Sequence, residues 1–263
     1  MVNILASIFL FITGAAVGSF ACCQVWRIRK NDKSKRSHCM NCKYQLKWYD
    51  NVPILSWLLL GGKCRKCHKK IGVMELLAEI FTGVVFLTTY WLWPEYKNLI
   101  QGDAWQIALF SVFLITLIFF AIMFIYDAKW KELPVSMLYA GIGCGVIFAV
   151  INCIRLGGVD WLSMLGSLLV LPGFYFLMYK VSRESWVGEG DYILCIPLAL
   201  MLGNFWLSAC ALFVSNLVGC LVMMPFVMGK KKHKVLIPFG PFLIIGFLTV
   251  YFAQNFILSL VVF

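Results

Sequence analysis

Two aspartates, Asp127 and Asp191, are the first residues in this sequence that could do chemistry, because each borders a long apolar run. A carboxylate beside a membrane-length apolar segment is costly to retain unless it has a function. Two carboxylates brought together do not both ionise easily, so one keeps a proton and acts as an acid while the other activates water. Such a pair can hydrolyse a peptide bond without a covalent intermediate, so Asp127 and Asp191 are candidates for a functional site.

Two glycines, Gly188 and Gly190, precede Asp191 in the segment Gly-Glu-Gly-Asp. Glycines remove side chains from the approach, so the backbone there can turn sharply or lie close to another chain, as a peptide substrate requires. The same four residues also fit an ordinary turn between helices in which Asp191 is the N-cap of the second helix. The tetrapeptide taken alone leaves both interpretations open.

The composition predicts an all-α polytopic membrane protein. Hydrophobic residues make up 62% of the 263 positions and charged residues only 13%, whereas ordinary globular chains are about half apolar. Apolar runs of about 20 residues predict transmembrane helices. We count about eight: residues 3–26, 71–93, 105–126, 135–153 and 161–180, two spans within residues 192–228 that meet near Gly203 and Asn204, and a final span after Pro241.

The basic residues cluster at the ends of the apolar runs, which argues for membrane orientation rather than nucleic-acid binding. In the eight-span arrangement, all but Lys97 and Arg155 of the 23 lysines and arginines fall in connections on one side. Cationic connections remain on the cytoplasmic side of a membrane. We therefore expect the two aspartates at the cytoplasmic face and both termini outside. Seven spans with one re-entrant segment would fit this distribution less well.

An abrupt change of composition marks residues 27–70 as a soluble, basic insert with two Cys-x-x-Cys pairs. Four thiolates suit a closed tetrahedral site, in which zinc is structural because no position remains for water. Metal binding would supply folding energy to an insert too short for a large core. The predicted zinc ligands are Cys39, Cys42, Cys64 and Cys67.

The cysteine pairs leave two further interpretations open. A pair of disulfides is the competing one, and cytoplasmic placement makes it the weaker one. His38 and His68 adjoin the cysteines and could replace one of them as a ligand. We expect both histidines to be exposed instead.

The first span carries small residues that suit helix packing, and the second span carries two glutamates. Gly14, Gly18 and Ser19 are spaced for close packing of the first span against another helix. Glu75 and Glu79 lie one helical turn apart on the second span. They could contact the insert, bind a substrate cation or extend to the membrane interface, and we expect the last.

Taken together, these features divide the chain into three parts. The first transmembrane helix occupies residues 1–26, and the cytoplasmic zinc-binding insert occupies residues 27–70. A transmembrane helical domain with the aspartyl protease site occupies residues 71–263.

Several stretches in order along the chain resemble the type IV prepilin peptidases, membrane aspartyl proteases with a Gly-x-Gly-Asp motif. The most specific is the tract from Trp48 to Leu58 between the cysteine pairs. The others are Gly18-Ser19-Phe20, the cysteine pairs themselves, the stretch from Glu79 to Gly83, Asp127 with Leu133-Pro134, the stretch from Gly188 to Asp191, and Pro238-Phe239-Gly240-Pro241.

The resemblance implies that the substrates are type IV prepilin or pseudopilin precursors, whose short basic leader is cleaved after a glycine. It places the enzyme in the bacterial inner membrane, with Asp127 and Asp191 as the catalytic dyad. Many members of this family also methylate the new N-terminus with S-adenosylmethionine, an activity associated with the N-terminal half. Glu75 and Glu79 are candidates for binding the basic leader.

The sequence departs from the family pattern at four places, none of which involves either aspartate. Cys22 stands where an asparagine is frequent, Val135 where an aspartate is frequent and Ile193 where a lysine is usual. The stretch Met74-Glu75-Leu76 replaces an Arg-Tyr-Pro. These departures concern methylation and substrate binding more than proteolysis.

A proton-coupled transporter with a regulatory zinc module is the alternative from another class, and a purely structural scaffold is the remaining one. Transporters usually show paired repeats and charges near the membrane midplane. Here no repeat is visible, and both aspartates are expected at one membrane face. These observations favour the protease.

Overall fold

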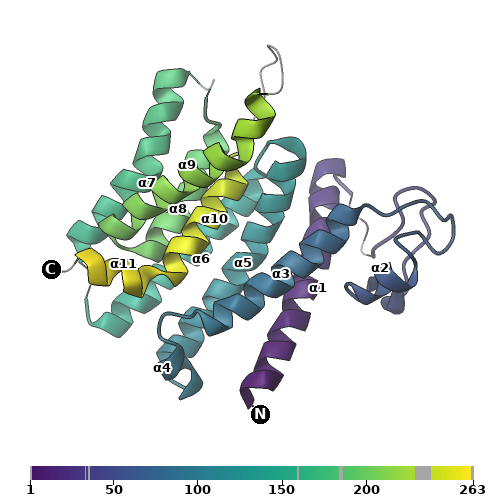
Figure 1. The fold of residues 1–263 in the computed structure, drawn as a ribbon, viewed down its shortest axis with the longest axis horizontal. Helices are drawn as coiled ribbons and strands as arrows, with labels where there is room; N and C mark the ends of the chain where they lie inside the picture. Colours follow the sequence, from purple (N-terminus) through teal and green to yellow (C-terminus); the bar gives the residue numbers. More distant parts are fainter. Residues whose placement is uncertain are drawn as a thin grey trace. The chain divides into compact units, whose positions relative to one another are not determined.

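The structure is a computed structural model that describes residues 2–32, 34, 36–158, 160–183, 186–228 and 238–261. The described residues form helices, turns and two isolated β-bridges but no strand, which confirms the predicted all-α class (Figure 1). Contacts divide the chain into two compact units, Met1–Leu92 and Trp93–Phe263. The predicted division into three parts stays a prediction.

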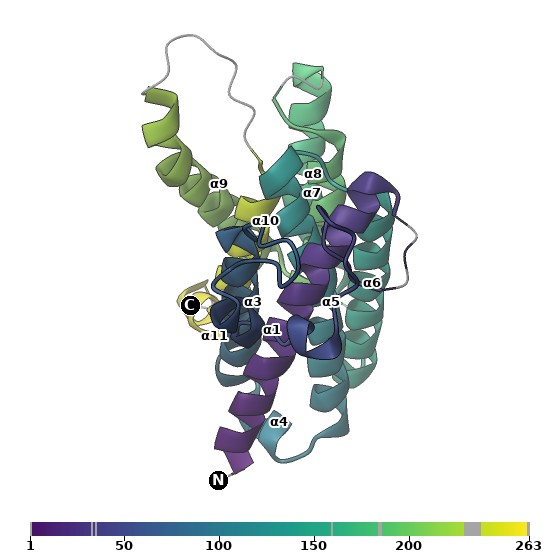
Figure 2. The ribbon, with the colours of Figure 1, turned by 90° about the vertical axis from the view of Figure 1, so that its right-hand side faces the viewer.

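In the first unit, α1 (Val2–Lys30) packs against α3 (Val73–Trp91), as Figures 1 and 2 show. Two glycines let the helices approach closely. A Cβ added at Gly14 would lie 2.6 Å from the Thr82 carbonyl oxygen, and one at Gly18 would lie 2.7 Å from the Ala78 carbonyl oxygen. The predicted packing of this small-residue face is confirmed.

The insert between these two helices is mostly irregular. It contains a short 3₁₀ helix, η1 (Trp48–Asn51), and one further turn of helix, α2 (Leu55–Leu59). Two isolated antiparallel bridges, His38 with Gln45 and Lys63 with Lys70, each close a loop around one cysteine pair. α1 continues to Lys30 before the irregular part begins, four residues beyond the predicted end of the span.

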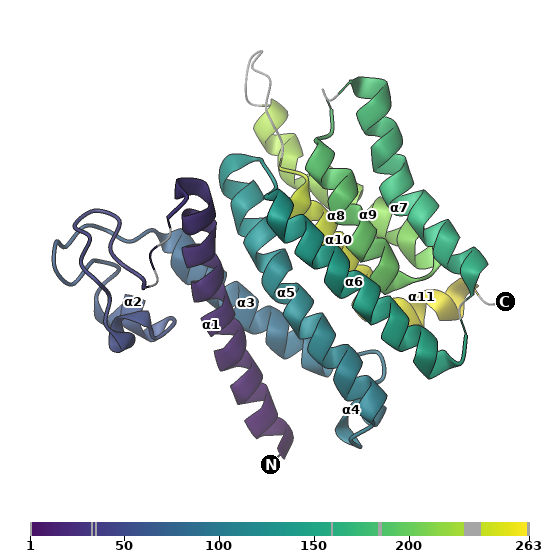
Figure 3. The ribbon, with the colours of Figure 1, turned by 180° about the vertical axis from the view of Figure 1, so that it is seen from behind.

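The second unit is a helical bundle. α8 contacts α6, α7 and α10, and these helices lie together in Figure 3. Aromatic side chains fill the contact between α5 and α10, where the Phe113 ring lies 4.6 Å from that of Tyr251 and the Phe120 ring lies 5.7 Å from that of Phe247. The helices are α4 (Tyr96–Ile100), α5 (Ala104–Trp130), α6 (Val135–Leu156), α7 (Trp161–Ser182), α8 (Glu189–Leu202), α9 (Phe205–Met228), α10 (Gly240–Phe252) and α11 (Gln254–Val261).

Membrane spans account for most of the described residues. Six helices, α1, α3, α5, α6, α7 and α9, are long and apolar enough to cross a membrane, and α10 with α11 would make a seventh span bent by 69°. The polytopic membrane architecture is confirmed, but the predicted count of eight is not. α8 has only 14 residues, and it ends at Gly203 in the left-handed conformation, where a break was predicted.

Candidate functional site

Asp127 lies in the last turn of α5 and is 4% exposed. Its Oδ2 atom accepts a hydrogen bond of 2.8 Å from the backbone N–H of Gly240, the first residue of α10. A Cβ at Gly240 would lie 2.9 Å from the same oxygen, so a larger residue there would crowd the carboxylate. The positive end of the α10 dipole also stabilises a negative charge at this position.

Asp191 is the third residue of α8 and is 9% exposed. Its Oδ2 atom accepts a 3.1 Å hydrogen bond from the backbone N–H of Gly188, which is the N-cap. The alternative in which Asp191 itself is the N-cap is therefore wrong. Asp191 caps the helix from within its first turn, where the helix dipole again favours a negative charge.

The two motif glycines differ in what the structure requires of them. A Cβ at Gly190 would lie 2.8 Å from the Cβ of Leu133, in the connection between α5 and α6. A Cβ at Gly188 would meet only Asp191 Oδ2 at an ordinary 3.6 Å, and its φ of −78° suits any residue. Gly190 thus lets the start of α8 pack closely against Leu133. Nothing in the described contacts requires a glycine at position 188.

Asp127 and Asp191 converge within the second unit, close enough for the charge of one to act on the other. Their meeting follows from the end of α5 lying beside the starts of α8 and α10. These last two helices have 14 and 13 residues, so each extends only about 20 Å. Both carboxylates are buried, and each has one oxygen held by a backbone N–H, which suits an acid and base pair.

Sequence reasoning did not select two polar residues beside this pair. Tyr175 on α7 is 2% exposed, and its hydroxyl oxygen accepts a 3.0 Å hydrogen bond from Asn216 Nδ2 on α9. Tyr175 is close enough to Asp191 for the charge of the carboxylate to act on it. The Tyr175 ring centroid also lies 6.5 Å from that of Phe239, the N-cap of α10. Both residues lie inside apolar runs, where no local signal distinguishes them.

The four predicted zinc ligands come together in the first unit. Their sulfur atoms all lie within 4.8 Å of one another, with Cys39 and Cys67 at 3.8 Å and Cys42 and Cys64 at 4.0 Å. Four thiolates around zinc at the usual bond length stand about 3.8 Å apart. All four cysteines are free thiols, so the described residues do not form the alternative disulfides.

The two cysteine pairs share one backbone geometry. The N–H of Lys43 donates to the Cys39 carbonyl, and the N–H of His68 donates to the Cys64 carbonyl, both at 2.9 Å. Lys43 and His68 both have positive φ angles, 56° and 54°. Two equivalent turns thus present two sulfurs each, as a tetrahedral metal site requires.

An ion pair ties the tract from Trp48 to Leu58 to the second cysteine pair. Arg65 Nε donates to Asp50 Oδ1 at 2.8 Å, and the Asp50 side chain is only 1% exposed. This hydrogen bond from the guanidinium to the carboxylate raises the pKa of Arg65. The most family-specific stretch of the sequence therefore contacts the second metal-binding turn through a buried carboxylate, Asp50, which pairs with Arg65 between Cys64 and Cys67.

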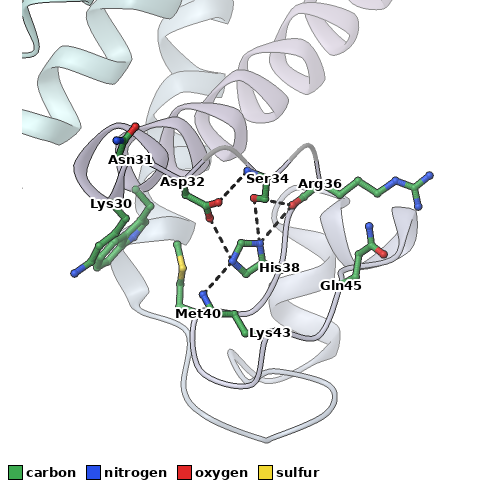
Figure 4. Close-up of a pocket in the computed structure, with 10 residues that line it drawn as sticks. Lys30, Asn31, Asp32, Ser34, Arg36, His38, Met40, Lys43 and Gln45 are labelled. Atoms are coloured by element: carbon green, nitrogen blue, oxygen red, sulfur yellow. Dashed lines mark hydrogen bonds and ion pairs between the residues drawn. The ribbon is translucent and has the colours of Figure 1, made fainter.

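His38 differs from the expectation, because its side chain is only 15% exposed. It lines a wide cavity of about 1090 Å³ and is central in Figure 4. Its ring nitrogens lie 3.4 Å from Asp32 Oδ2, 3.4 Å from Ser34 Oγ and 3.5 Å from Lys43 Nζ. The expected exposure is wrong for His38, because Asp32 and Ser34, which follow α1, lie against its ring. The expected exposure is correct for His68.

Glu79 also differs from the expectation, because it is 9% exposed and does not extend to an interface. Its Oε2 atom accepts a 2.7 Å hydrogen bond from the backbone N–H of Ile54 in the insert. Glu75, which is partly buried, folds back over the start of α3, where a Cβ at Gly72 would lie 2.5 Å from its Oε2. Of the three open roles, contact with the insert is the one observed for Glu79.

Comparison with known proteins matches both units. Residues 12–93 match the Bacterial Peptidase A24 N-terminal domain, and residues 114–262 match the Type IV leader peptidase family. No solved structure matches. Both family descriptions are of peptidases, which disfavours the transporter alternative.

Curated relatives extend over nearly the whole chain. The Type 4 prepilin-like proteins leader peptide-processing enzyme of Escherichia coli O78:H11 is 32% identical, covering 83% of this chain and 76% of its own. The Prepilin leader peptidase/N-methyltransferase of Vibrio cholerae is 25% identical over 94% of this chain and 96% of its own. The protein of the same name from Neisseria gonorrhoeae is 30% identical over 83% of this chain and 71% of its own length. This chain belongs to the type IV leader peptidase family.

Proposed function

We propose that this protein is a membrane aspartic endopeptidase that removes the basic leader from type IV prepilin-like precursors, with Asp127 and Asp191 as its catalytic pair. The observation that carries the proposal is the convergence of two buried carboxylates at the starts of α8 and α10. The names of the relatives supply the substrate class.

The geometry supports general acid–base hydrolysis. One carboxylate is ionised and takes a proton from water, while the protonated one polarises the scissile carbonyl, and the roles exchange as the amine leaves. Gly240 and Gly188 hold the Oδ2 atoms of Asp127 and Asp191. Within the described part of the chain no hydrogen bond engages the Oδ1 atoms, which would serve the water and the substrate.

The zinc site and the orientation belong to the same proposal. The sulfur separations support one structural zinc ion held by Cys39, Cys42, Cys64 and Cys67. The distribution of lysine and arginine supports an active site at the cytoplasmic face of the inner membrane, with both termini outside.

Methylation of the new N-terminus is the second activity that we propose, on the strength of the N-methyltransferase names of several relatives. S-adenosylmethionine would supply the methyl group. The departures at Cys22 and at Met74-Glu75-Leu76 fall in the first unit and concern this activity rather than cleavage.

The deciding experiment is co-expression with a tagged prepilin, followed by intact mass measurement of the product. We expect leader removal by the wild type and none by Asp127→Asn or Asp191→Asn, because an amide cannot exchange the proton. Asp103→Asn is the matched control, since Asp103 caps the other end of α5 by accepting from the Trp105 N–H and asparagine caps equally well. Cleavage by either dyad variant would remove that residue from the mechanism.

A further inference from the structure

The insert of the first unit carries an apolar face that no described part of the chain covers. Leu55, Leu58 and Leu59 of α2 have the spacing i, i+3 and i+4, so they lie on one side of the helical turn. Leu55 is 56% exposed, Leu58 is 58% exposed and Leu59 is 79% exposed. Trp48 of η1, in the same tract, is 81% exposed. Apolar side chains grouped in this way on a surface mark a contact with a partner or a membrane.

A hydrogen bond fixes the depth of α2 along the spanning helix α3. The backbone N–H of Ile54, the N-cap of α2, donates to Glu79 Oε2 at 2.7 Å. Because α3 begins at Val73, Glu79 lies about 9 Å along it. The 19 residues of α3 extend about 28 Å, and the hydrocarbon core of a bilayer is about 30 Å thick. Spanning therefore uses nearly all of α3, and α2 begins beside its membrane-spanning part.

The contact of the insert with α1 gives the same depth. The 29 residues of α1 extend about 43 Å, which is longer than the hydrocarbon core requires. Cys23 Sγ, which lies before the last turns of α1, is 3.6 Å from Ser37 Oγ in the insert. Figures 1 and 3 show α2 level with the middle of α1 and not beyond its end. The insert thus folds back along both helices, which brings α2 to the membrane surface.

The charge of the insert complements a membrane surface with anionic lipids. Five exposed lysines flank η1 and α2 in the sequence: Lys47, Lys63, Lys66, Lys69 and Lys70. The carboxylates within residues 27–70 are those of Asp32 and Asp50, and Asp50 is buried in its ion pair with Arg65. Anionic headgroups attract such a basic segment. An apolar face with flanking cations is typical of a segment that lies in the membrane interface.

We propose that α2 docks into the boundary between headgroups and acyl chains of the membrane that α1 and α3 span, with Leu55, Leu58 and Leu59 among the lipid chains. The insert, expected from composition to be soluble, is then partly embedded, and its four cysteines are held near the membrane surface. The proposal does not depend on the peptidase activity. Another protein surface, such as a second copy of this chain, would cover the same face but would keep lipid away from it.

The test is fluorescence quenching in the full chain, loaded with zinc, in nanodiscs of phosphatidylethanolamine and phosphatidylglycerol. A fluorescent amino acid is placed at Leu59 or, as the matched control, at Gln45, an exposed polar residue of the insert. Lipids with a spin label near the headgroup quench from the acyl chains, and iodide quenches from water. We expect lipid quenching at Leu59 to exceed that at Gln45 by about threefold, because interfacial helices bury their apolar face roughly 5–10 Å deep. Iodide should show the reverse order.

Two results would overturn the proposal. Iodide quenching as strong at Leu59 as at Gln45, without excess quenching by lipid, would place α2 in water. Protection of Leu59 from both quenchers would show that protein covers the face. Zinc content equal to that of the unlabelled chain reports a folded insert, and Leu58 is the second labelling position if the label at Leu59 lowers it. Asp127→Asn should leave the quenching unchanged, so failure of the peptidase proposal would not affect this one.

Discussion

Backbone N–H groups hold both carboxylates of the proposed dyad, one from a distant part of the chain and one from the start of the same helix. Asp127 is held by the N–H of Gly240, and Asp191 by the N–H of Gly188. Backbone donors lose no side-chain entropy when they bind, so they orient a carboxylate at low cost. Substitutions that shift these donors should affect catalysis even though they leave both aspartates in place.

Gly190 gives a test at this scale. We expect Gly190→Ala to lower kcat/KM for prepilin cleavage by about a hundredfold, because its Cβ would lie 2.8 Å from Leu133 Cβ and displace Asp191. Shortening the neighbour in the double variant Gly190→Ala, Leu133→Ala should restore part of the activity. Gly188→Ala is the matched control and should stay within about threefold of wild type, since its Cβ meets only an ordinary contact.

The glycine explanation would fail in two ways. Full activity of Gly190→Ala would show that α8 can shift without harm to the site. A Gly188→Ala variant as inactive as Gly190→Ala would show that the first glycine serves the substrate and not the packing.

At the scale of elements, two short helices set the position of the site. α8 and α10 have 14 and 13 residues and extend about 20 Å each, whereas the hydrocarbon core of a bilayer is about 30 Å thick. Both begin beside an aspartate, so their positive ends converge on the pair. The partial charges of two helix ends offset part of the cost of keeping a carboxylate in an apolar bundle.

The insert is the other element whose structure depends on a few contacts. It has little regular structure, and four sulfurs with the Asp50–Arg65 ion pair hold its turns together. A segment with so small a core gains much of its folding energy from metal binding. Its stability should therefore follow its zinc content.

Cys64→Ser tests this dependence. We expect the zinc content of the purified protein to fall from about one ion per chain to near zero, because a neutral hydroxyl is a poor zinc ligand. Trypsin should then cleave faster within residues 27–70. Cys220→Ser, an exposed cysteine on α9, should change neither zinc content nor cleavage rate. Wild-type protein without zinc, or full zinc in Cys64→Ser, would refute the site.

At the scale of the whole molecule, charge decides orientation. The two exceptions to the one-sided distribution of lysine and arginine are Lys97 and Arg155, and the structure pairs Arg155 with Glu95. An ion pair carries little net charge, so Lys97 remains the main cation of that side among the described residues. This pairing strengthens the expected orientation, with the insert in the cytoplasm.

Reporter fusions check the orientation. Green fluorescent protein fused after Lys66 should fluoresce, because it folds in the cytoplasm. Alkaline phosphatase fused after Gly102 should be active, because it folds in the periplasm. The exchanged reporters are the controls and should both be inactive. The reverse pattern would place the insert outside and would contradict a cytoplasmic leader-cleaving site.

The sequence by itself determined the membrane class, the residues of the proposed dyad and the four-cysteine set. These features depend on local composition and spacing, so apolar runs predict helices and Cys-x-x-Cys pairs predict a metal site without knowledge of the fold. The break at Gly203 was also readable, because a run of residues 192–228 is too long for one span.

Only the tertiary structure decided which groups complete these sites. The Gly240 N–H at Asp127, the contact of Gly190 with Leu133 and the burial of Glu79 against Ile54 each join residues that are distant in sequence. Packing between helices creates such contacts, and no local pattern encodes them. For the same reason a glutamate expected at an interface was found buried, and α8 proved shorter than a full span.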